Sequence, residues 1–371
     1  YILAVNPDIL SAAGMDKGSV FTATAFSSAI ATLMIAFLAK LPFAQAPGMG
    51  LNAFFAFTLV LGMGYSWETA LAAVFAEGII FIIITLLNIR EKVVNCIPLN
   101  LRYAMSVCIG MFIAFIGLKN SGVIEANPAT FVALGKFTPV SLLAIMGIVI
   151  SGVLMAKGVK GALFYSILLC TAIGIPMGVT ALPENFTIMS LPPSMAPTFL
   201  KFDFASLLNI DMFFIVLLLV FMDLFNTIGT LVGAAAKTEM MDEKGNIPNM
   251  KEALLADAIG TSVGAVCGTS TVTTYVESAA GIAEGGRSGL TAFVVGILFF
   301  VALLFAPVFL LVPSAATTGA LVSVGVFMME SVRKIDFSDM TEALPAFVTI
   351  IVMVLAYSIA EGMAMGMMSY A

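Results

Sequence analysis

The 371-residue sequence contains no histidine, which excludes His-ligated metals, Ser-His catalytic triads and histidine proton relays. Charged residues are also scarce, at 10% compared with about 25% in an ordinary soluble domain. There are only four cysteines, far apart and without a CxxC pair, so we interpret them as packing residues: Cys96, Cys108, Cys170 and Cys267. These absences exclude an ordinary soluble domain, and nothing indicates a nucleic-acid partner.

Hydrophobic residues make up 61% of the chain, and the mean hydropathy is +1.10. Apolar runs of roughly 20 residues recur along it, each long enough to cross about 30 Å of hydrocarbon. The sequence therefore predicts an all-α polytopic membrane protein. The expected segments are 19–39, 51–62, 67–88, 98–118, 138–156, 161–180, 209–234, 252–268, 276–284, 289–308, 313–331 and 344–367.

Two of these segments, 51–62 and 276–284, are too short to span a membrane. Each follows an extended stretch, 46–50 (APGMG) and 269–275 (TSTVTTY). The second stretch is rich in β-branched residues and reads as a short strand. We therefore expect two broken helices, each preceded by a short extended segment.

The two broken segments align with each other when the sequence is shifted by 225 residues, which pairs Asn52 with Glu277. A shift of 215 residues then pairs, in the same order, Pro98 with Pro313 and Gly110 with Gly325. Paired interrupted segments in two halves are typical of secondary transporters. We expect two inverted repeats, 1–205 and 206–371. In this register both chain ends fall inside a helix, so we expect truncated ends and a complete fold of seven plus seven segments.

The distribution of lysine and arginine gives an orientation. If the first helix starts in the cytoplasm, twelve Lys and Arg residues lie in cytoplasmic loops and four lie outside, which satisfies the positive-inside rule. The polar loop 237–251 is then cytoplasmic, and the proline-rich linker 181–206 between the repeats is external.

Asp223 lies in the middle of the segment 209–234. Its spacing from Asn226 and Thr227 places all three side chains on one face of a helix. An intramembrane carboxylate is costly to bury and is functional by default. We expect a substrate-binding or proton-carrying acid, and a structural carboxylate bonded to neighbouring backbone is the alternative.

Glu277 begins the second broken helix, where free backbone N–H groups make a polar site. Its repeat partner Asn52 occupies the same point of the first broken helix, so we expect the two side chains to face each other. The alternative is a residue favoured only by the helix dipole.

Three other carboxylates, Glu77, Asp257 and Glu361, are less informative. Each could be a packing or interface carboxylate, and we expect a functional role for none of them in particular. The loop 285–289 (GGRSG) lacks the lysine of a phosphate-binding P-loop and reads as a tight cytoplasmic turn.

Several motifs together resemble the adenine/guanine/hypoxanthine permease branch of the nucleobase:cation symporter-2 (xanthine/uracil permease) family. They occur in the right order over essentially the full length. They are 1–7 (YILAVNP), 45–57 (QAPGMGLNAFFAF), 222–231 (MDLFNTIGTL), 268–282 (GTSTVTTYVESAAGI), 285–290 (GGRSGL) and 356–362 (AYSIAEG).

The resemblance implies a fourteen-segment transporter of the plasma (inner) membrane, and not an enzyme. A core domain, about 1–88 and 209–308, would move against a gate domain, about 98–180 and 313–371, in an elevator-like cycle. The expected substrates are purine bases carried with protons, without any other cofactor. The family's binding carboxylates fall on Asp223 and Glu277, with Asn52 facing them. The Gln-His pair of the uracil, xanthine and ascorbate branches is absent.

The resulting hypothesis is that Glu277 binds the base and that Asp223, or the two acids together, takes up the proton. The other expected substrate-binding residues are Asn226, Thr274 and Tyr275. The other expected partners are the lipid bilayer and a second copy of the chain, with which it would form a homodimer. Two other classes stay open: an anion exchanger of the same fold, and an intramembrane aspartyl protease using Asp223 and Asp257. The first should lack the carboxylates, and the second should have Gly-x-Gly-Asp surroundings.

Overall fold

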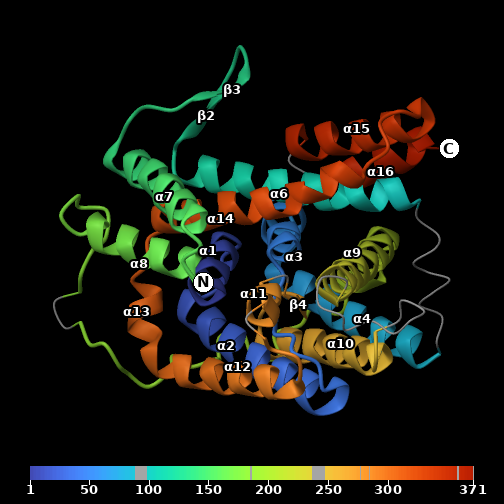
Figure 1. Ribbon diagram of the computed structural model, residues 1–371, viewed down its shortest axis with the longest axis horizontal. Coiled ribbons are helices and arrows are strands. Elements are labelled where there is room, and N and C mark those ends of the chain that lie inside the picture. Colours follow the sequence, from blue (N-terminus) through green and yellow to red (C-terminus); the bar gives the residue numbers. More distant parts are fainter. Residues whose placement is uncertain are drawn as a thin grey trace.

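The computed structural model describes residues 1–87, 98–183, 186–235, 247–275, 277–283, 285–356 and 359–370. It is mostly helical, with two pairs of short strands (Figure 1). Seven of the described helices are long and apolar enough to cross a membrane: Lys17–Ala39, Trp67–Leu86, Tyr103–Asn120, Pro139–Ala156, Ile210–Ile228, Gly289–Leu310 and Ser314–Lys334. The prediction of a helical polytopic membrane protein is confirmed.

One group of helices surrounds one of the two strand pairs, the pair that lies near the middle of the molecule (Figure 1). Within it, α2 packs on α1, α10 and α12, and α4 packs on α9 and α10. Its helices are α1 (Ile2–Ala12), α2 (Lys17–Met34), α3 (Met49–Ala53), α4 (Trp67–Leu86), α9 (Ile210–Ala235), α10 (Met250–Cys267), α11 (Ser278–Ala283) and α12 (Gly289–Ala302). Two of them continue as π-helical turns, α2 through Ile35–Ala39 and α3 through Phe54–Gly62.

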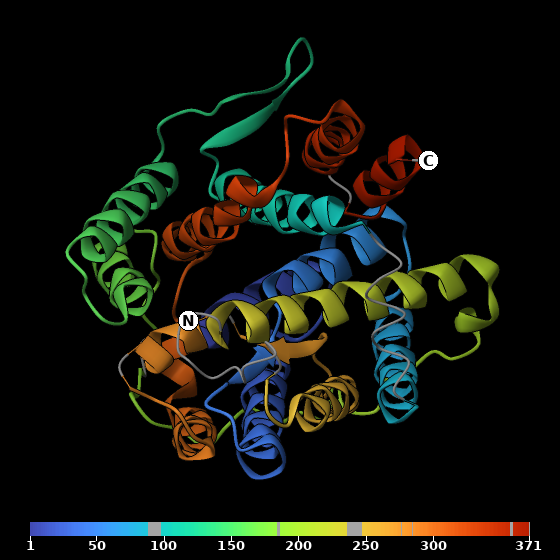
Figure 2. The same ribbon diagram turned by 45° about the vertical axis from the view of Figure 1, so that its right-hand side comes forward.

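A second group packs around α6 (Leu99–Asn120) and α14 (Ser314–Met329), which contact each other extensively. In Figure 2, α6, α14 and the two C-terminal helices lie above the first group. The remaining helices of the second group are α7 (Pro139–Ala156), α8 (Ala162–Gly174), α15 (Met340–Leu355) and α16 (Ile359–Tyr370). The short α13 (Ala306–Leu310) lies just before α14 in the chain.

Helix starts are set by side chains that accept otherwise unpaired backbone N–H groups. Asp16 accepts the backbone N–H of Ser19 at the start of α2. Thr138 and Ser141 form a reciprocal capping box at α7. These caps explain why the predicted starts of the segments 19–39 and 138–156 agree with the structure to within two residues.

Two predictions of the sequence analysis need correction. The segment 344–367, expected as one membrane helix, is two helices, α15 and α16, which pack against each other. Gly362 permits this close packing, because a Cβ there would lie 2.8 Å from the backbone nitrogen of Met353. The continuous apolar pattern conceals the break. The second correction is an unpredicted hairpin, β2 (Ile124–Asn127) with β3 (Phe131–Leu134).

The described residues include only part of the predicted cytoplasmic loop 237–251, since 236–246 lie outside them. Cys96 also lies outside them, whereas the other three cysteines are buried and unpaired, in line with a packing role.

Residues that the shift of 215 positions pairs in the sequence also occupy corresponding positions in the structure. Pro98 and Pro313 are the residues immediately before α6 and α14. Gly110 and Gly325, paired by the same shift, contact each other where these helices cross. A Cβ on Gly110 would lie 2.8 Å from the Gly325 carbonyl oxygen, and one on Gly325 would lie 2.6 Å from that of Gly110.

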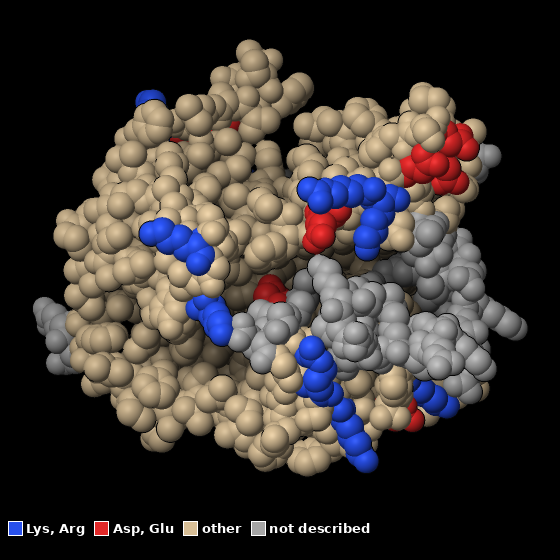
Figure 3. Space-filling model, viewed as in Figure 1, with Lys and Arg blue, Asp and Glu red and all other residues tan. Residues whose placement is uncertain are grey.

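The outer surface suits a lipid environment. On α12 six large apolar side chains are exposed: Leu290, Phe293, Val294, Ile297, Leu298 and Val301. Charged residues are few and scattered over the face shown in Figure 3. An exposed apolar face of this extent would be an aggregation hazard in water.

We expect Gly319→Ala to destabilise the protein. Gly319 on α14 contacts Gly147 on α7, and a Cβ there would overlap the Gly147 carbonyl oxygen. Forcing the two helices apart should cost about 1–3 kcal/mol. The matched control is Gly152→Ala on α7, where nothing lies within 4 Å of the added carbon. Thermal unfolding in detergent should give a lower Tm for Gly319→Ala only. An unchanged Tm would contradict this packing.

Candidate functional site

The centre of the site is a pair of short antiparallel strands, one from each half of the chain. β1 (Gln45–Pro47) pairs with β4 (Val272–Thr274), with Gln45 opposite Thr274 and Pro47 opposite Val272. All six residues are buried. β1 runs into α3, and β4 precedes α11 by three residues. The prediction of two broken helices that follow extended segments is therefore confirmed.

The outer edges of this strand pair are closed by threonine hydroxyls. Thr32 of α2 accepts the Gln45 N–H (2.9 Å) and donates to the Gln45 carbonyl (3.0 Å). On the other edge, Thr261 of α10 donates to the Val272 carbonyl (2.8 Å), and Thr227 of α9 accepts the Thr274 N–H (3.4 Å). Backbone groups inside a membrane protein need partners within the protein, and these hydroxyls supply them.

Glu277 lies beside two tyrosines, just before α11. The Tyr1 hydroxyl donates to its Oε1 at 2.5 Å. The Tyr1 and Tyr275 rings have centroids 6.2 Å apart and are tilted by 45°. All three residues are partly buried. The structure thus places a carboxylate next to two aromatic rings, the second of them on the predicted residue Tyr275.

Asn52 is fully buried in α3. Its carbonyl oxygen accepts the Ser270 hydroxyl at 2.6 Å, and its amide donates to the Pro47 carbonyl at 3.5 Å. The Tyr275 hydroxyl donates to the same Pro47 carbonyl at 3.0 Å. Asn52 and Glu277 are expected to face each other. In the structure they are linked indirectly, because Asn52 and Tyr275 both bond the Pro47 carbonyl and Tyr275 lies beside Glu277.

Asp223 is fully buried on α9, a helix that contacts β4. Its Oδ2 accepts a long hydrogen bond from Thr261 (3.4 Å), and its Oδ1 has no partner among the described residues. Its electrostatic neighbours are two further buried carboxylates, Glu77 of α4 and Asp257 of α10. We call Glu77, Asp223 and Asp257 the carboxylate cluster.

Asp257 accepts more hydrogen bonds from protein groups than the other two members of the cluster. Its Oδ1 accepts from the Gln45 amide (2.9 Å) and the Thr274 hydroxyl (3.1 Å), and its Oδ2 accepts from Thr227 (3.0 Å). Three donors suit an ionised carboxylate. The predicted residue Thr274 is therefore engaged inside the protein, in contact with Asp257.

Asn226, the remaining predicted site residue, donates to the Thr273 hydroxyl at 3.2 Å. Thr273 and Thr227 are also bonded, at 2.7 Å. These contacts attach α9 to β4. Asn226 thus positions the strand in this conformation.

The sequence assigns no particular role to Glu77 and Asp257, and the structure places both beside Asp223. The rule that intramembrane carboxylates are functional by default applied to both, but their separation along the chain from Asp223 hid the proximity. The hypothesis from the sequence also treats Asp223 and Glu277 as one pair, whereas the neighbours of Asp223 are Glu77 and Asp257.

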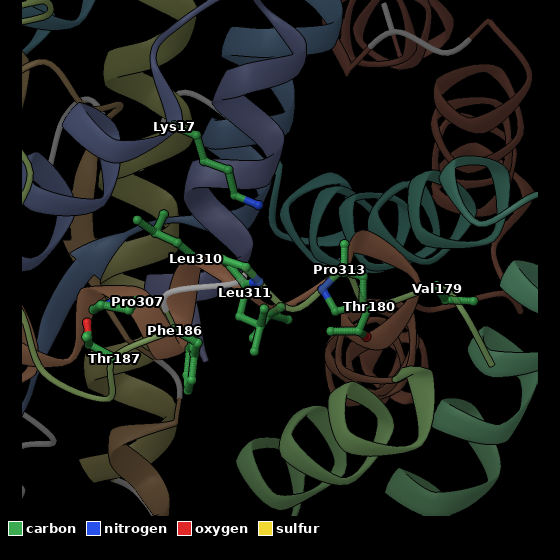
Figure 4. Close-up of a pocket in the computed structure, with 12 residues that line it drawn as sticks. Lys17, Val179, Thr180, Phe186, Thr187, Pro307, Leu310, Leu311 and Pro313 are labelled. Carbon is green, nitrogen blue, oxygen red and sulfur yellow. The ribbon is translucent and has the colours of Figure 1, made fainter. Parts of the chain in front are cut away.

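A pocket of about 530 Å³ lies elsewhere, between the segment that follows α8 and the segment that joins α13 to α14 (Figure 4). It is mostly apolar, and among the described residues that line it Lys17 is the charged one. None of the predicted site residues lines it.

We expect Thr227→Val to destabilise the protein. The change preserves shape but removes the hydroxyl that serves Asp257, Thr273 and the Thr274 N–H. Leaving buried polar groups without partners costs about 1–3 kcal/mol each. Thr227→Ser keeps the hydroxyl and is the matched control. Thermal unfolding should show a lower Tm for the valine variant than for the serine variant, and equal values would contradict the role of the hydroxyl.

Comparison with known proteins places the chain among permeases. Residues 1–365 match the model of the Permease family, Xan_ur_permease. The chain is 50% identical over its whole length to the putative permease MJ0326 of Methanocaldococcus jannaschii, of which it covers 85%. It is 41% identical to the adenine permease AdeP of Escherichia coli and 43% identical to the guanine/hypoxanthine permease PbuG of Bacillus subtilis. Both alignments span the whole chain, and they cover 83% and 86% of those proteins.

Among solved structures, the transmembrane domain of the cyanobacterial bicarbonate transporter BicA superposes with a TM-score of 0.70 at 15% identity. The alignment covers 99% of this chain and 96% of that one. This likeness shows a shared fold. Together with the full-length sequence matches, it establishes a multi-pass membrane transporter rather than an enzyme. The chain belongs to the Permease family that the Xan_ur_permease model describes.

Proposed function

We propose that this permease carries purine nucleobases, namely adenine, guanine or hypoxanthine, into the cell together with protons. The printed activities of AdeP and PbuG, each more than 40% identical over the whole chain, support the substrate class. A location in the plasma membrane follows from import into the cell.

The observation that carries the proposal is the carboxylate of Glu277 beside the rings of Tyr1 and Tyr275. A purine base is flat and neutral, and its edge carries N–H donors and ring-nitrogen acceptors. The Glu277 carboxylate can accept N–H bonds from that edge, and a tyrosine ring offers a stacking surface of the kind aromatic groups favour.

Specificity would come from the cost of unpaired polar groups. A base without an N–H group to donate to the Glu277 carboxylate leaves that hydrogen bond unmade, and each unmade bond costs about 1–3 kcal/mol. An apolar compound of the same size would leave several of these hydrogen bonds unmade.

Asp223 is proposed to take part in proton coupling. It is fully buried and belongs to the carboxylate cluster, while Glu277 is partly buried and bonded to Tyr1. This difference in burial and partners supports separate roles, in which Glu277 binds the base and Asp223 exchanges the proton. Asn52, Asn226, Thr274 and Tyr275 would hold the strands and the base in place.

The finer architecture is also a proposal. We infer two inverted repeats, 1–205 and 206–371, within a fold of seven plus seven segments. The pairing of β1 with β4 and the contact of Gly110 with Gly325 support it. The two helix groups would act as a core, about 1–88 and 209–308, and a gate, about 98–180 and 313–371. The core would move in an elevator-like cycle. A homodimer stays a prediction.

Uptake by proteoliposomes tests the function. We expect labelled adenine, guanine or hypoxanthine to accumulate when the outside is acidic. A one-proton symporter driven by about one pH unit can concentrate its substrate up to about tenfold. Collapsing the gradient with a protonophore should abolish the accumulation, and uracil should serve as the negative control.

Accumulation that ignores the gradient would reject proton coupling. If no purine enters under either condition, the substrate class is wrong, and exchange of bicarbonate or another anion becomes the next assay. Among the described site contacts, no lysine or arginine is bonded to Glu277 or Asp223, which disfavours an anion site.

Glu277→Gln and Asp223→Asn should separate the two roles. We expect Glu277→Gln to abolish purine binding, measured as substrate-induced thermal stabilisation. Asp223→Asn should retain binding and exchange of labelled for unlabelled base, but lose acceleration by an acidic exterior. The reverse pattern would refute the division of labour.

A further inference from the structure

Glu77 is a buried carboxylate that the binding site does not use. It lies on α4, is fully buried, and has only apolar neighbours on its own turn of helix except Gly78. Gly78 lets α4 approach α10 closely, because a Cβ there would lie 2.9 Å from the Ser262 backbone nitrogen and overlap the Ser262 hydroxyl. This close approach brings Glu77 into the carboxylate cluster.

Only one of the two carboxylate oxygens of Glu77 accepts a hydrogen bond from the described residues. Oε2 accepts the Thr271 hydroxyl at 2.7 Å, and Oε1 has no partner among the described residues. Asp223 likewise has an unpartnered oxygen, Oδ1. Asp257 in contrast accepts from three donors. Within the cluster, Asp257 is therefore suited to carry the negative charge, and the other two acids are not.

No positive charge balances the cluster in the described part of the chain. The elements packed on α4 are α9, α10, the turn Phe54–Gly62 and the short helix Ser206–Leu208. The titratable groups that face Glu77 from them are Asp223 and Asp257. Two or three adjacent carboxylates without a counter-charge cannot all stay ionised in a low-dielectric interior. A proton on Glu77 or Asp223 removes a charge and supplies a donor for an unpartnered oxygen.

We propose that Glu77 holds a proton in the resting protein and shares the coupling proton with Asp223. Glu77 is thus a positioning and proton-holding residue, outside contact with the base. The step is the reversible binding of one proton to a carboxylate oxygen, with no other bond formed or broken. The proposal extends the proposed symport function and rests on it for its role in transport.

Glu77 is connected to the binding side through one residue. Thr271, which bonds Glu77, also accepts the Gly48 N–H with its backbone carbonyl at 3.0 Å. Gly48 lies between Pro47, whose carbonyl accepts from Tyr275, and α3. A change of protonation at Glu77 therefore acts directly on the strands that hold the proposed base site.

The test begins with a measurement that needs no transport. The infrared spectrum of the purified protein should contain a carbonyl band of a protonated carboxylic acid, and this band should disappear in Glu77→Gln. The matched control is Thr85→Val on the same helix, since Thr85 is also fully buried and its hydroxyl has no partner among the described residues. This control should keep the band. If Glu77→Gln does not fold, wild-type protein labelled with carbon-13 glutamate should show a shifted band.

The transport arm compares the same variants. Glu77→Gln should exchange labelled for unlabelled purine as well as the wild type does, while its accumulation driven by about one pH unit falls from about tenfold to about onefold. Thr85→Val should keep both activities. An unchanged band together with unchanged accumulation in Glu77→Gln would overturn the proposal. If wild-type protein takes up no purine but the band depends on Glu77, the symport function fails while the proton assignment stands.

Discussion

The antiparallel pairing of β1 with β4 is the constraint on which the rest of the structure depends. Two chain segments leave the helical conformation deep inside a membrane protein, where exposed backbone groups have no water to bind. They satisfy each other, and Thr32, Thr227 and Thr261 satisfy their outer edges. Helices α2, α9 and α10 are thereby fixed around one small strand pair.

The site contains two kinds of carboxylate. Glu277 lies with the tyrosines, partly buried and bonded to Tyr1. Asp223 and Asp257 lie with Glu77, without exposed surface. Their chemistry differs accordingly, because a partly buried carboxylate can meet a ligand, whereas a closed cluster can exchange only a proton or rearrange. The threonines of β4 contact both the cluster and the helices, so a change on one side affects the other.

Much of this arrangement could be predicted from the sequence. The scarcity of charge, the apolar runs and the two interrupted segments predict a helical membrane transporter. They place Glu277 at the start of a broken helix and Asp223 in the middle of a membrane segment. The extended stretches 46–50 and 269–275 before the two short segments predict the positions of β1 and β4. These features are local, or they recur at a fixed shift, so one sequence contains the signal.

Other features depend on contacts between distant segments. Glu77 joins Asp223 and Asp257 because Gly78 lets α4 pack closely on α10, and no spacing along the chain reveals that. The break between α15 and α16 lies inside a continuous apolar run, where hydropathy alone cannot show a turn. Tyr1 contacts Glu277, which lies 276 positions further along the chain, and sequence periodicity does not reveal a contact over that distance.

Proton-coupled transport requires that binding of the base and binding of the proton be linked. The most direct measurement is the affinity of the purified protein for hypoxanthine, adenine and guanine as a function of pH, by calorimetry in two buffers of different ionisation enthalpy. The account predicts that binding takes up protons and that the Kd rises as the pH rises. Binding of a purine with the same Kd at every pH, and with no proton uptake, would contradict it.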